Sequence, residues 1–512
     1  MQLKMLLTSR TIWRGVVFSA VAVLLVFKYV VPNPSAEAAA SVPSAITEVM
    51  LGPSHLIFTP CWLEGSREQV LCGSYQVYEN RQSHAGRQIN IQIAVLPALK
   101  NHPAPDALFI LAGGPGQAAN AYGPFVDVAL KKLHQDRDIV LIDQRGTGKS
   151  NPLNCQAAPD ALPFTAVHQS FSDSAQACLA KLDGDPRFYS SFDFAADLDD
   201  VRQALGYSQI DIWGGSYGTR VALVYMKTHP NLVRAAVLDG VAPYSNKIPL
   251  YEARDAQRAL DMVFLACDED EKCHTAFPDL RQNFTAVLSK LDKSPAHASI
   301  RNPHTGVPTD IVVNKANFAT ALRTLLYVPS FDHLVPLVIR DASDGNFETL
   351  VAATQEISHG ANKDMSRGLM LSVLCSEDVP RIGPQEVNDF TRGTFLGDVM
   401  VKSFSSACSR WPRASLPPDF DSFVDTPVPT LMLSGELDPV TPPEWAKLAA
   451  LHLPNSVQVV VPGATHGVSA YGCVPDLIAR FVGAGSASGL DTSCVAKGIR
   501  SPFVTSPTGI TP

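Results

Sequence analysis

The chain has 512 residues, 46% of them hydrophobic and 18% charged, and a formal net charge of −8. This composition is that of a folded protein with room for a large core and a second domain, and it excludes the disordered and low-complexity classes. The acidic balance, without a long basic run, argues against a nucleic-acid partner.

The N-terminus is typical of an exported protein. Three basic residues among the first 14 precede an apolar run at 15–27, and small residues at 36–40 provide cleavage sites. We therefore expect residues 1–40 to be a signal peptide and the mature chain to be periplasmic or secreted. Residues 29–31 extend the apolar run toward the roughly 20 residues that span a bilayer. An uncleaved N-terminal membrane anchor is therefore the alternative, and it is the only membrane contact expected.

Ten cysteines support the same compartment. Their even number and their spacing in neighbouring pairs predict disulfides, which form in oxidising compartments. No C-x-x-C pair occurs, and zinc sites need tighter clusters with nearby histidines, so neither a metal nor a cofactor is expected. The simplest connectivity joins Cys61–Cys72, Cys155–Cys178, Cys267–Cys273, Cys375–Cys408 and Cys473–Cys494.

Two kinds of strand are predicted. Residues 45–105 indicate antiparallel strands at a sheet edge, and the clearest is at 88–96, where polar and apolar side chains alternate at first. Largely apolar runs predict buried strands of a parallel sheet. These runs are at 107–112, 138–143, 210–213, 235–241, 429–434 and 457–461. Because helical patterns separate several of them, we expect an α/β protein with a mostly parallel central sheet.

The strand predicted at 210–213 runs into the motif GGSYG at 214–218, and an amphipathic helical pattern follows. This is the G-x-S-x-G arrangement of a nucleophile elbow, in which a serine lies on a sharp turn between a strand and a helix. Gly214 and Gly218 lack the side chains that would prevent the turn from closing. Ser216 is therefore predicted to be a nucleophile raised above the sheet, at the N-terminus of a helix.

A serine hydroxyl needs a histidine that takes its proton and a carboxylate that orients the histidine. Asp438 and His466 each follow an apolar strand in the last part of the chain, and the order serine, acid, histidine is the one this arrangement requires. They are predicted to complete a catalytic triad. Glu436 and Asp239 are rival acids, and we expect both to be structural loop carboxylates.

Two backbone N–H groups are needed to hold the oxyanion that forms during acyl transfer. The first is assigned to Tyr217, the residue that follows the nucleophile. The second is expected in the loop after an earlier core strand, where the motif GGPG occupies 113–116. Because Pro115 has no N–H group, Gly114 is the predicted second donor.

Five motifs together resemble the prolyl and tripeptidyl aminopeptidases, which are serine exopeptidases of the α/β-hydrolase fold. They are GGPG at 113–116, DQRGTGKS at 143–150, GGSYGT at 214–219, SGELDPVTP at 434–442 and GATHG at 463–467. The last two are similar to the C-terminal region of the tripeptidyl type, whose larger size and export also fit this chain. The sequence departs from the prolyl type at Ala112, where prolyl members often carry histidine.

Regular alternation of strands and helices stops between 245 and 425, where helical patterns dominate. We interpret this stretch as a large helical cap inserted after the sixth strand of an α/β-hydrolase core. The expected divisions are 45–244 for the first part of the core, 245–425 for the mainly helical cap, 426–483 for the second part of the core and 484–512 for an irregular tail tethered by a disulfide.

The resemblance implies an exported serine aminopeptidase that releases one or a few residues from peptides with a free N-terminus. Such a site needs an anionic group in the cap to bind the substrate ammonium. Glu377 and Asp378, close to the disulfide expected at Cys375, are the candidates. A carboxylesterase for small esters is the alternative, because the triad serves both reactions. A non-catalytic binding protein on the same scaffold is the third hypothesis, although such proteins usually lack a triad member.

Overall fold

The structure is a computed structural model. It describes residues 48–155, 164, 170–303, 305–329, 331–363, 365–497 and 500–506. The signal peptide or anchor predicted at 1–40 lies outside the described residues. Within the described ranges, no helix is both long enough and apolar enough to cross a bilayer.

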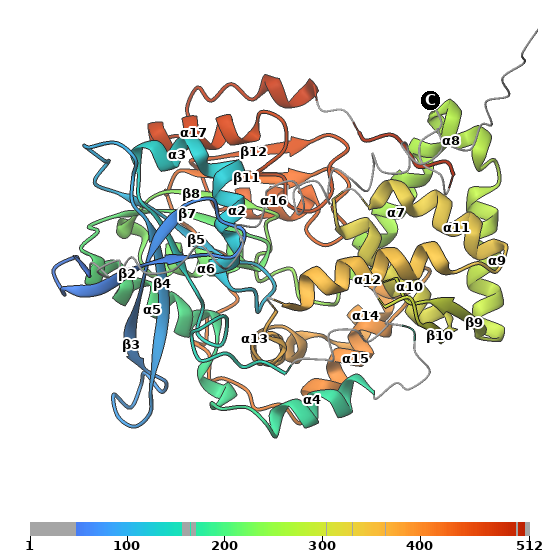
Figure 1. Cartoon of the computed structure of the whole chain (residues 1–512), viewed down its shortest axis with the longest axis horizontal. Coiled ribbons are helices and arrows are strands. Elements are labelled where there is room, and N and C mark those ends of the chain that lie inside the picture. The colour runs from blue at the N-terminus through green and yellow to red at the C-terminus, as the bar shows by residue number, and fades with distance from the viewer. Residues whose placement is uncertain are drawn as a thin grey trace, which may run out of the picture.

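A ten-stranded mixed sheet forms the centre of the molecule (Figure 1). Every strand pair from β1 to β6 is antiparallel, and every pair from β6 to β12 is parallel. The predicted α/β class and antiparallel edge are therefore confirmed. In spatial order the strands are β1 (Val49–Leu51), β2 (Leu56–Trp62), β3 (Gln69–Tyr78), β4 (Gln88–Leu96), β6 (Ile139–Ile142), β5 (Ala107–Leu111), β7 (Ile210–Gly215), β8 (Val233–Asp239), β11 (Thr430–Gly435) and β12 (Ser456–Val461).

Helices cover both faces of this sheet (Figure 1). Alternate residues of a strand point to opposite faces, so that Phe109 of β5 packs in one apolar cluster and Ile110 in the other. Each central strand is therefore apolar throughout, which explains the continuous runs in the sequence. The first cluster includes α5 (Ser191–Leu205), α6 (Tyr217–Thr228) and α16 (Pro443–Ala450), and the second includes α3 (Lys131–Asp136) and α17 (Val474–Ala484).

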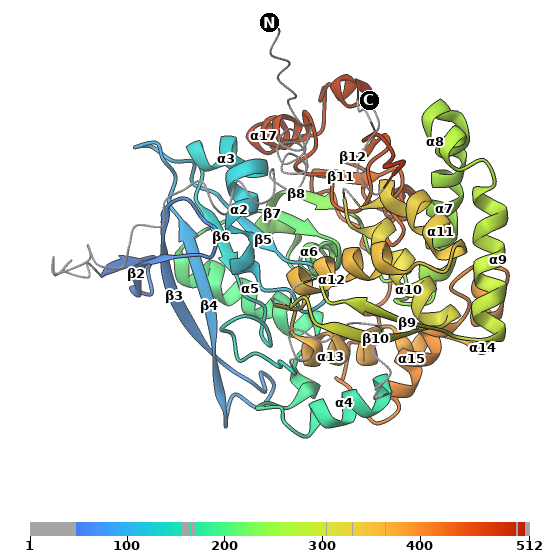
Figure 2. The ribbon, with the colours of Figure 1, turned by 45° about the vertical axis from the view of Figure 1, so that its right-hand side comes forward.

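Between β8 and β11 the chain forms a mainly helical body with its own apolar core, gathered on one side of the sheet in both ribbon views (Figures 1 and 2). It follows the eighth strand of the chain, because β1 and β2 add two edge strands to the count. Without these two, β8 is the sixth strand. The helices are α7 (Glu252–Glu269), α8 (Glu271–Ala276), α9 (Leu280–Lys293), α10 (Lys315–Tyr327), α11 (Val335–Ser343), α12 (Glu348–Lys363), α13 (Arg367–Glu377), α14 (Pro384–Thr391) and α15 (Val399–Cys408).

The inserted body also contains a two-stranded hairpin that the sequence did not lead us to expect (Figure 2). Strands β9 (Ala296–Arg301) and β10 (Pro308–Val313) pair antiparallel over six residues each. Exposed and more buried positions alternate along β9. Its residues AHASIR carry little apolar contrast, since alanine and serine occupy three of the six positions, so the period of two is faint in the sequence.

All ten cysteines form disulfides, in the connectivity predicted from their spacing. The Cα–Cα distances lie between 5.1 and 6.4 Å, within the range that disulfides require. Cys375–Cys408 joins α13 to α15, and Cys473–Cys494 connects the start of α17 to the C-terminal segment. The covalent links therefore lie in the helical body and at the sheet edges, where they restrain peripheral segments.

The C-terminal segment, predicted as an irregular, disulfide-tethered tail at 484–512, also packs against the inserted body. After η7 (Ser493–Lys497), residues 500–506 cross to the inserted helical body, where Phe503 is only 4% exposed within its apolar core. The Val504 N–H also donates to the His333 carbonyl oxygen at 3.2 Å. Packing therefore holds this segment in addition to the disulfide of Cys494.

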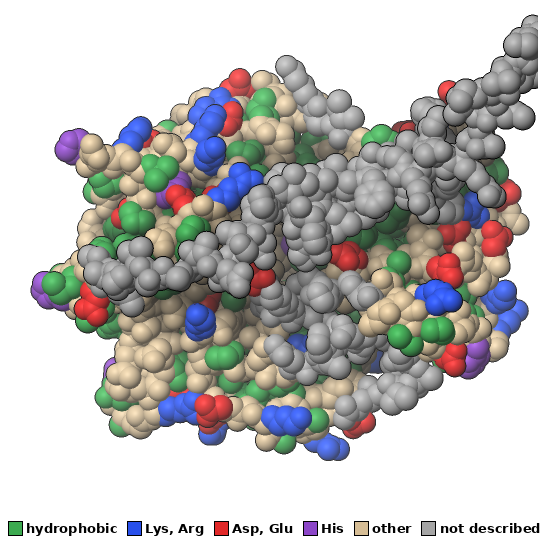
Figure 3. Space-filling model, in the orientation of Figure 1, with side chains coloured by type: hydrophobic (Ala, Val, Ile, Leu, Met, Phe, Trp, Pro, Cys, Tyr) green, Lys and Arg blue, Asp and Glu red, His purple; other side chains and the backbone are tan. Residues whose placement is uncertain are grey.

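Figure 3 shows one face of the molecule in space-filling form. Basic and acidic side chains are interspersed over the described part of this face, without one large patch of either sign. Phosphate backbones are bound by clustered lysine and arginine side chains, and this described surface offers no such track.

Candidate active site

Ser216 lies on the sharp turn between β7 and α6. Its backbone has φ 54° and ψ −122°, and a positive φ costs energy for residues other than glycine. The neighbouring residues are buried, whereas Ser216 keeps partial exposure. The turn therefore presents the serine hydroxyl at the C-terminal edge of the parallel strands, in the geometry of a nucleophile elbow.

Two glycines allow this turn to close. A Cβ atom on Gly214 would lie 2.7 Å from the Gly218 carbonyl oxygen, which is too close for any real side chain. A Cβ atom on Gly218 would overlap the Leu111 carbonyl oxygen at the end of β5. Both positions need glycine because other backbone segments occupy the space that a side chain would fill.

Asp438 and His466 meet at the end of β11 and β12. The imidazole Nδ1 lies 2.7 Å from the Asp438 Oδ2, so the ring N–H donates to the carboxylate. The Thr441 hydroxyl donates to the same oxygen at 2.7 Å and lies 3.0 Å from the imidazole Nδ1. The N–H groups of Val440 and Thr441 both donate to the Asp438 Oδ1 at 2.9 Å. The carboxylate is therefore held by four donors, one of them the imidazole.

The charges of this pair support each other. Burial raises the pKa of Asp438, but the charge and hydrogen bond of His466 and the two backbone donors outweigh it, so this pKa lies below its usual value. Burial lowers the pKa of His466, while the charge and hydrogen bond of Asp438 and the charge of Asp239 raise it, with a net rise. A carboxylate beside an imidazole favours the imidazolium that forms when the ring takes a proton.

The two rival acids have other partners. The Glu436 carboxylate accepts a hydrogen bond from the Gly463 N–H at 2.8 Å. The Asp239 carboxylate accepts the N–H groups of Val468 and Ser469, at 2.9 and 2.7 Å. Both carboxylates therefore stabilise the loop around His466 from its main chain and do not bind the ring.

The loop at 113–116 passes beside Ser216. A Cβ atom on Gly113 would lie 3.2 Å from the Ser216 Cβ. Gly114 has φ 112°, a backbone conformation that only glycine adopts readily. Among the described residues, neither the Gly114 N–H nor the Tyr217 N–H forms a hydrogen bond with another group. Both predicted oxyanion donors are thus unoccupied by the protein's own acceptors, and their role stays a prediction.

Known proteins resemble this chain over different lengths. Serine protease Hip1 from Mycobacterium tuberculosis (strain ATCC 25618 / H37Rv) is 25% identical over 486 residues, which cover 85% of this chain and 90% of Hip1. The putative hydrolase YuaR of Escherichia coli (strain K12) is 29% identical over 251 residues, 45% of this chain and 50% of YuaR. The probable proline iminopeptidase of Streptomyces coelicolor is 31% identical over 188 residues, 36% of this chain and 47% of that protein.

Two protein families match separate parts of the chain. The family described as alpha/beta hydrolase fold matches residues 106–274, which contain the elbow, and the family described as TAP-like protein matches residues 393–494, which contain Asp438 and His466. The chain has the α/β-hydrolase fold, and these matches, with the relatives Hip1 and proline iminopeptidase, support the prolyl and tripeptidyl aminopeptidase family. It is therefore an enzyme of the serine hydrolase class. The crystal structure of proline iminopeptidase from Mycobacterium smegmatis covers 80% of this α/β-hydrolase and 98% of that chain, at 17% identity and a TM-score of 0.39.

The carboxylates predicted to bind the substrate amine are both fully buried in this α/β-hydrolase. Glu377 accepts the Ser191 N–H at 2.7 Å, the Ser191 hydroxyl at 2.8 Å and the Tyr244 hydroxyl at 3.0 Å. Asp378 pairs with the Arg220 guanidinium at 2.6 Å. Burial raises the pKa of Glu377 to about 7, against the lowering effect of Arg220.

These contacts correct the assignment made from the sequence. Both side chains are committed to the packing of α13 against α5 and α6, and neither leaves an exposed oxygen for a substrate ammonium. A sequence shows that two neighbouring residues are charged, but it does not show that a basic partner 158 positions away buries one of them.

A different acid, which the sequence analysis did not single out, is connected to the triad. Glu252 opens α7, is 8% exposed, and places its Oε2 2.7 Å from the Arg323 Nη2. The Arg323 guanidinium lies 5.8 Å from the centre of the Tyr327 ring, and that ring stacks on His466. Within the described part of the chain, this buried Oε2 of Glu252 forms no hydrogen bond besides the ion-pair contact with Arg323. A buried carboxylate of the inserted body is therefore linked to the candidate base through Arg323 and Tyr327.

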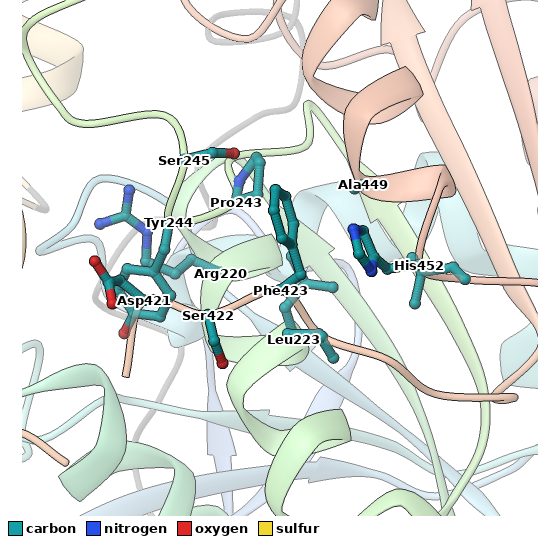
Figure 4. A pocket seen from close by; sticks show the side chains of 12 residues that line it. Arg220, Leu223, Pro243, Tyr244, Ser245, Asp421, Ser422, Phe423, Ala449 and His452 are labelled. Atoms are coloured by element: carbon teal, nitrogen blue, oxygen red, sulfur yellow. The ribbon is translucent and has the colours of Figure 1, made fainter. Parts of the chain in front are cut away.

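A small hollow beside α6 is separate from these residues (Figure 4). Its lining is largely apolar and includes Phe423 and His452, whose rings stack with their centres 4.2 Å apart. None of the three candidate catalytic residues lines it. Across the described ranges, no three histidine, cysteine, aspartate or glutamate side chains are grouped as metal ligands would be.

Proposed function

We propose that this enzyme is an exported serine aminopeptidase that removes one or a few residues from peptides with a free N-terminus. The observation that carries the proposal is the 2.7 Å hydrogen bond between His466 and Asp438 at the same sheet edge as the strained elbow of Ser216. The peptidase names of the relatives Hip1 and proline iminopeptidase support the same reaction class.

The proposed reaction follows from these positions. The Ser216 hydroxyl attacks the scissile carbonyl carbon while His466 takes its proton, and Asp438 stabilises the resulting imidazolium. The Gly114 and Tyr217 N–H groups hold the oxyanion. The imidazolium then gives its proton to the leaving amine, an acyl-enzyme remains, and water hydrolyses it by the same base to release the N-terminal fragment.

Export is supported by the covalent structure. Five disulfides with no free cysteine in the described chain fit an oxidising compartment. We propose a periplasmic or secreted enzyme, with retention on the membrane through the N-terminal segment as the alternative. Cells that express the full-length chain are fractionated, and the N-terminus of the recovered protein is sequenced. A cleaved chain begins near residue 41, whereas an anchored chain keeps its N-terminal segment and stays with the membrane.

Recognition of a free N-terminus needs an anion near the base, and we propose Glu252 for this role in place of Glu377 and Asp378. Its Oε2 lies 2.7 Å from the Arg323 Nη2 and forms no other hydrogen bond in the described chain. Burial raises the pKa of Glu252 more than Arg323 lowers it, so this pKa lies above its usual value. A substrate ammonium bound to this carboxylate would lower its pKa, favour the ionised form and form a charge-assisted hydrogen bond.

The test uses matched substrates. Prolyl, alanyl and Ala-Ala-Pro anilides are offered with free and with acetylated N-termini, together with p-nitrophenyl acetate and butyrate. The proposal predicts turnover of free-amine anilides and little turnover of acetylated ones, and the best anilide gives the length of the released fragment. If only the esters are hydrolysed, the peptidase proposal fails and the carboxylesterase alternative replaces it.

A matched pair of variants tests the amine site. Glu252→Gln removes the charge and is expected to raise KM for free-amine anilides by about ten- to a hundredfold, the effect of one charge-assisted hydrogen bond. It should leave the hydrolysis of p-nitrophenyl acetate unchanged. Glu271→Gln, an exposed acid on α8, is the control and should alter neither. Equal KM values in wild type and Glu252→Gln would exclude Glu252 as the amine site.

A further inference from the structure

An aromatic side chain from the inserted helical body lies flat on the candidate base. Tyr327, the last residue of α10, stacks on His466 with ring centres 4.5 Å apart and an angle of 25° between the ring planes. His466 lies in the loop after β12, far from α10 in the sequence. The stack thus brings a side chain of the inserted body onto the candidate base of the core.

The Tyr327 ring is itself held in place. Leu325 and Leu326, its neighbours on α10, are buried in the core of the inserted body. Arg323 lies one turn earlier on α10, faces the Tyr327 ring, and pairs with Glu252 of α7. Two helices therefore fix the ring that covers His466, and the Tyr327 hydroxyl forms no hydrogen bond within the described part of the chain.

The hydrogen bonds of the imidazole do not prevent the ring from tilting. Asp438 and Thr441 both approach the ring at Nδ1. Hydrogen bonds at a single atom allow the ring to tilt about that atom, and tilting moves Nε2, the atom that must face Ser216. A flat contact on the ring face opposes this tilt, since stacked rings lose contact when their planes separate.

We infer that Tyr327 is a positioning residue for His466. Its ring holds the plane of the imidazole and places an aromatic face against the imidazolium. This inference rests on the proposed role of His466 as the base. A cation on the face of an aromatic ring is stabilised by the ring quadrupole. The stack therefore favours the charged form of His466 in addition to orienting the neutral one.

Other charged groups also act on His466 and must be kept constant. Asp438 and Asp239 raise its pKa, and Arg323 lowers it. None of them is changed by a substitution at Tyr327. Leucine at 327 keeps an apolar side chain of similar bulk, so that the burial of the imidazole is retained while the π face is lost. Phenylalanine keeps the ring and removes only the hydroxyl.

The experiment compares Tyr327→Phe with Tyr327→Leu by two readouts. The first is the rate at which a fluorophosphonate modifies Ser216 as a function of pH, because this rate reports the protonation of the base in the free enzyme without a substrate. The second is kcat and KM for the best substrate of the wild type. Thermal unfolding of each variant separates a local effect from loss of the fold.

We expect Tyr327→Phe to match the wild type in both readouts. We expect Tyr327→Leu to lower kcat by about three- to tenfold with little change in KM, and to move the acidic limb of the labelling profile down by about half a pH unit. The sign follows because loss of the π face destabilises the imidazolium, so the ring stays neutral to a lower pH.

The inference is overturned if Tyr327→Leu keeps the wild-type kcat and the wild-type labelling profile. It is also overturned if both variants lose activity equally, since the hydroxyl and not the stack would then matter. Failure of the triad itself has a different signature, because Ser216→Ala would retain activity and the fluorophosphonate would not label residue 216.

Discussion

The main-chain carbonyl oxygen of Asp239 accepts a hydrogen bond from the Ser216 N–H at 2.8 Å. The carboxylate of the same aspartate accepts the Ser469 N–H at 2.7 Å and the Ser469 hydroxyl at 2.6 Å, three residues after His466. One residue at the end of β8 therefore fixes the nucleophile elbow through its backbone and the histidine loop through its side chain. The spacing between the proposed nucleophile and the proposed base therefore depends on a residue that binds neither side chain.

Asp239→Asn is predicted to destabilise the enzyme. Both carboxylate oxygens accept N–H groups, so the asparagine amide must present its own N–H2 to at least one of these donors. A buried N–H without an acceptor costs about 1–3 kcal/mol. Urea unfolding should show this loss, while Asp344→Asn, at an exposed position, should leave the unfolding midpoint unchanged. Equal midpoints for both variants would show that the loop does not depend on Asp239.

Gly218→Ala is predicted to prevent a stable elbow, because the new methyl group would overlap the Leu111 carbonyl oxygen of β5. The strand or the helix must then move, which costs several kcal/mol and removes activity. Gly483 in α17 is the matched control, since a Cβ atom there has no neighbour within 4 Å. Gly483→Ala should raise the free energy of unfolding by about 0.5–1 kcal/mol. Similar effects of the two substitutions on the free energy of unfolding would contradict the packing argument.

Thr441→Val is predicted to slow the reaction without unfolding the enzyme. Valine keeps the shape but removes the hydroxyl that donates to Asp438 and lies beside the imidazole Nδ1. The loss of one such bond costs about 1 kcal/mol, which corresponds to a roughly fivefold fall in kcat. Thr441→Ser keeps the hydroxyl and should retain most of the wild-type rate. If the serine variant is as slow as the valine variant, the methyl group matters and the hydroxyl does not.

The pH dependence of kcat/KM is expected to report the protonation of His466, the proposed base, in the free enzyme. Burial lowers the pKa of His466, but Asp438 and Asp239 raise it, with a net rise above the usual value of about 6.5. A base must be neutral to take a proton, so activity is full above this pKa and is lost as the pH falls through it. The acidic limb should therefore lie above pH 6.5.

Asp438→Asn should move that limb to lower pH, because the negative charge that favours the imidazolium is gone. It should also lower kcat by about 10⁴-fold, since the ring loses its orienting carboxylate. The residual activity is measured by ester hydrolysis, and the rate of the Ser216→Ala variant is subtracted as background. An unchanged limb in Asp438→Asn would show that another group controls the titration.

The sheet and the residues at its edge could be predicted because their signals are local. A buried parallel strand is a short apolar run, and the elbow needs two glycines around Ser216 for reasons of space alone. Asp438 and His466 stand out because each directly follows such a run, and the ends of parallel strands lie at one edge. The disulfides were predictable because each pair is close in the sequence.

The features that could not be predicted from the sequence depend on contacts between distant segments. Nothing in the residues around Tyr327 indicates that its ring covers His466, since α10 is an ordinary amphipathic helix in the sequence. Glu377 was predicted as a substrate ligand because the family resemblance implies an anionic group in the cap, whereas Ser191 and Tyr244 bind and bury it. Phe503 lies in a segment rich in serine and proline, and its insertion into a distant apolar core has no local signature.

The most direct test of the account follows the products of one peptide. A free peptide and its N-acetylated twin are incubated with wild-type enzyme and with Ser216→Ala, and the fragments are identified by mass spectrometry. We expect the wild type to shorten the free peptide from its N-terminus and to leave the acetylated peptide intact. We expect Ser216→Ala to act on neither peptide. Equal cleavage of both peptides, cleavage at internal bonds, or activity in Ser216→Ala would contradict it.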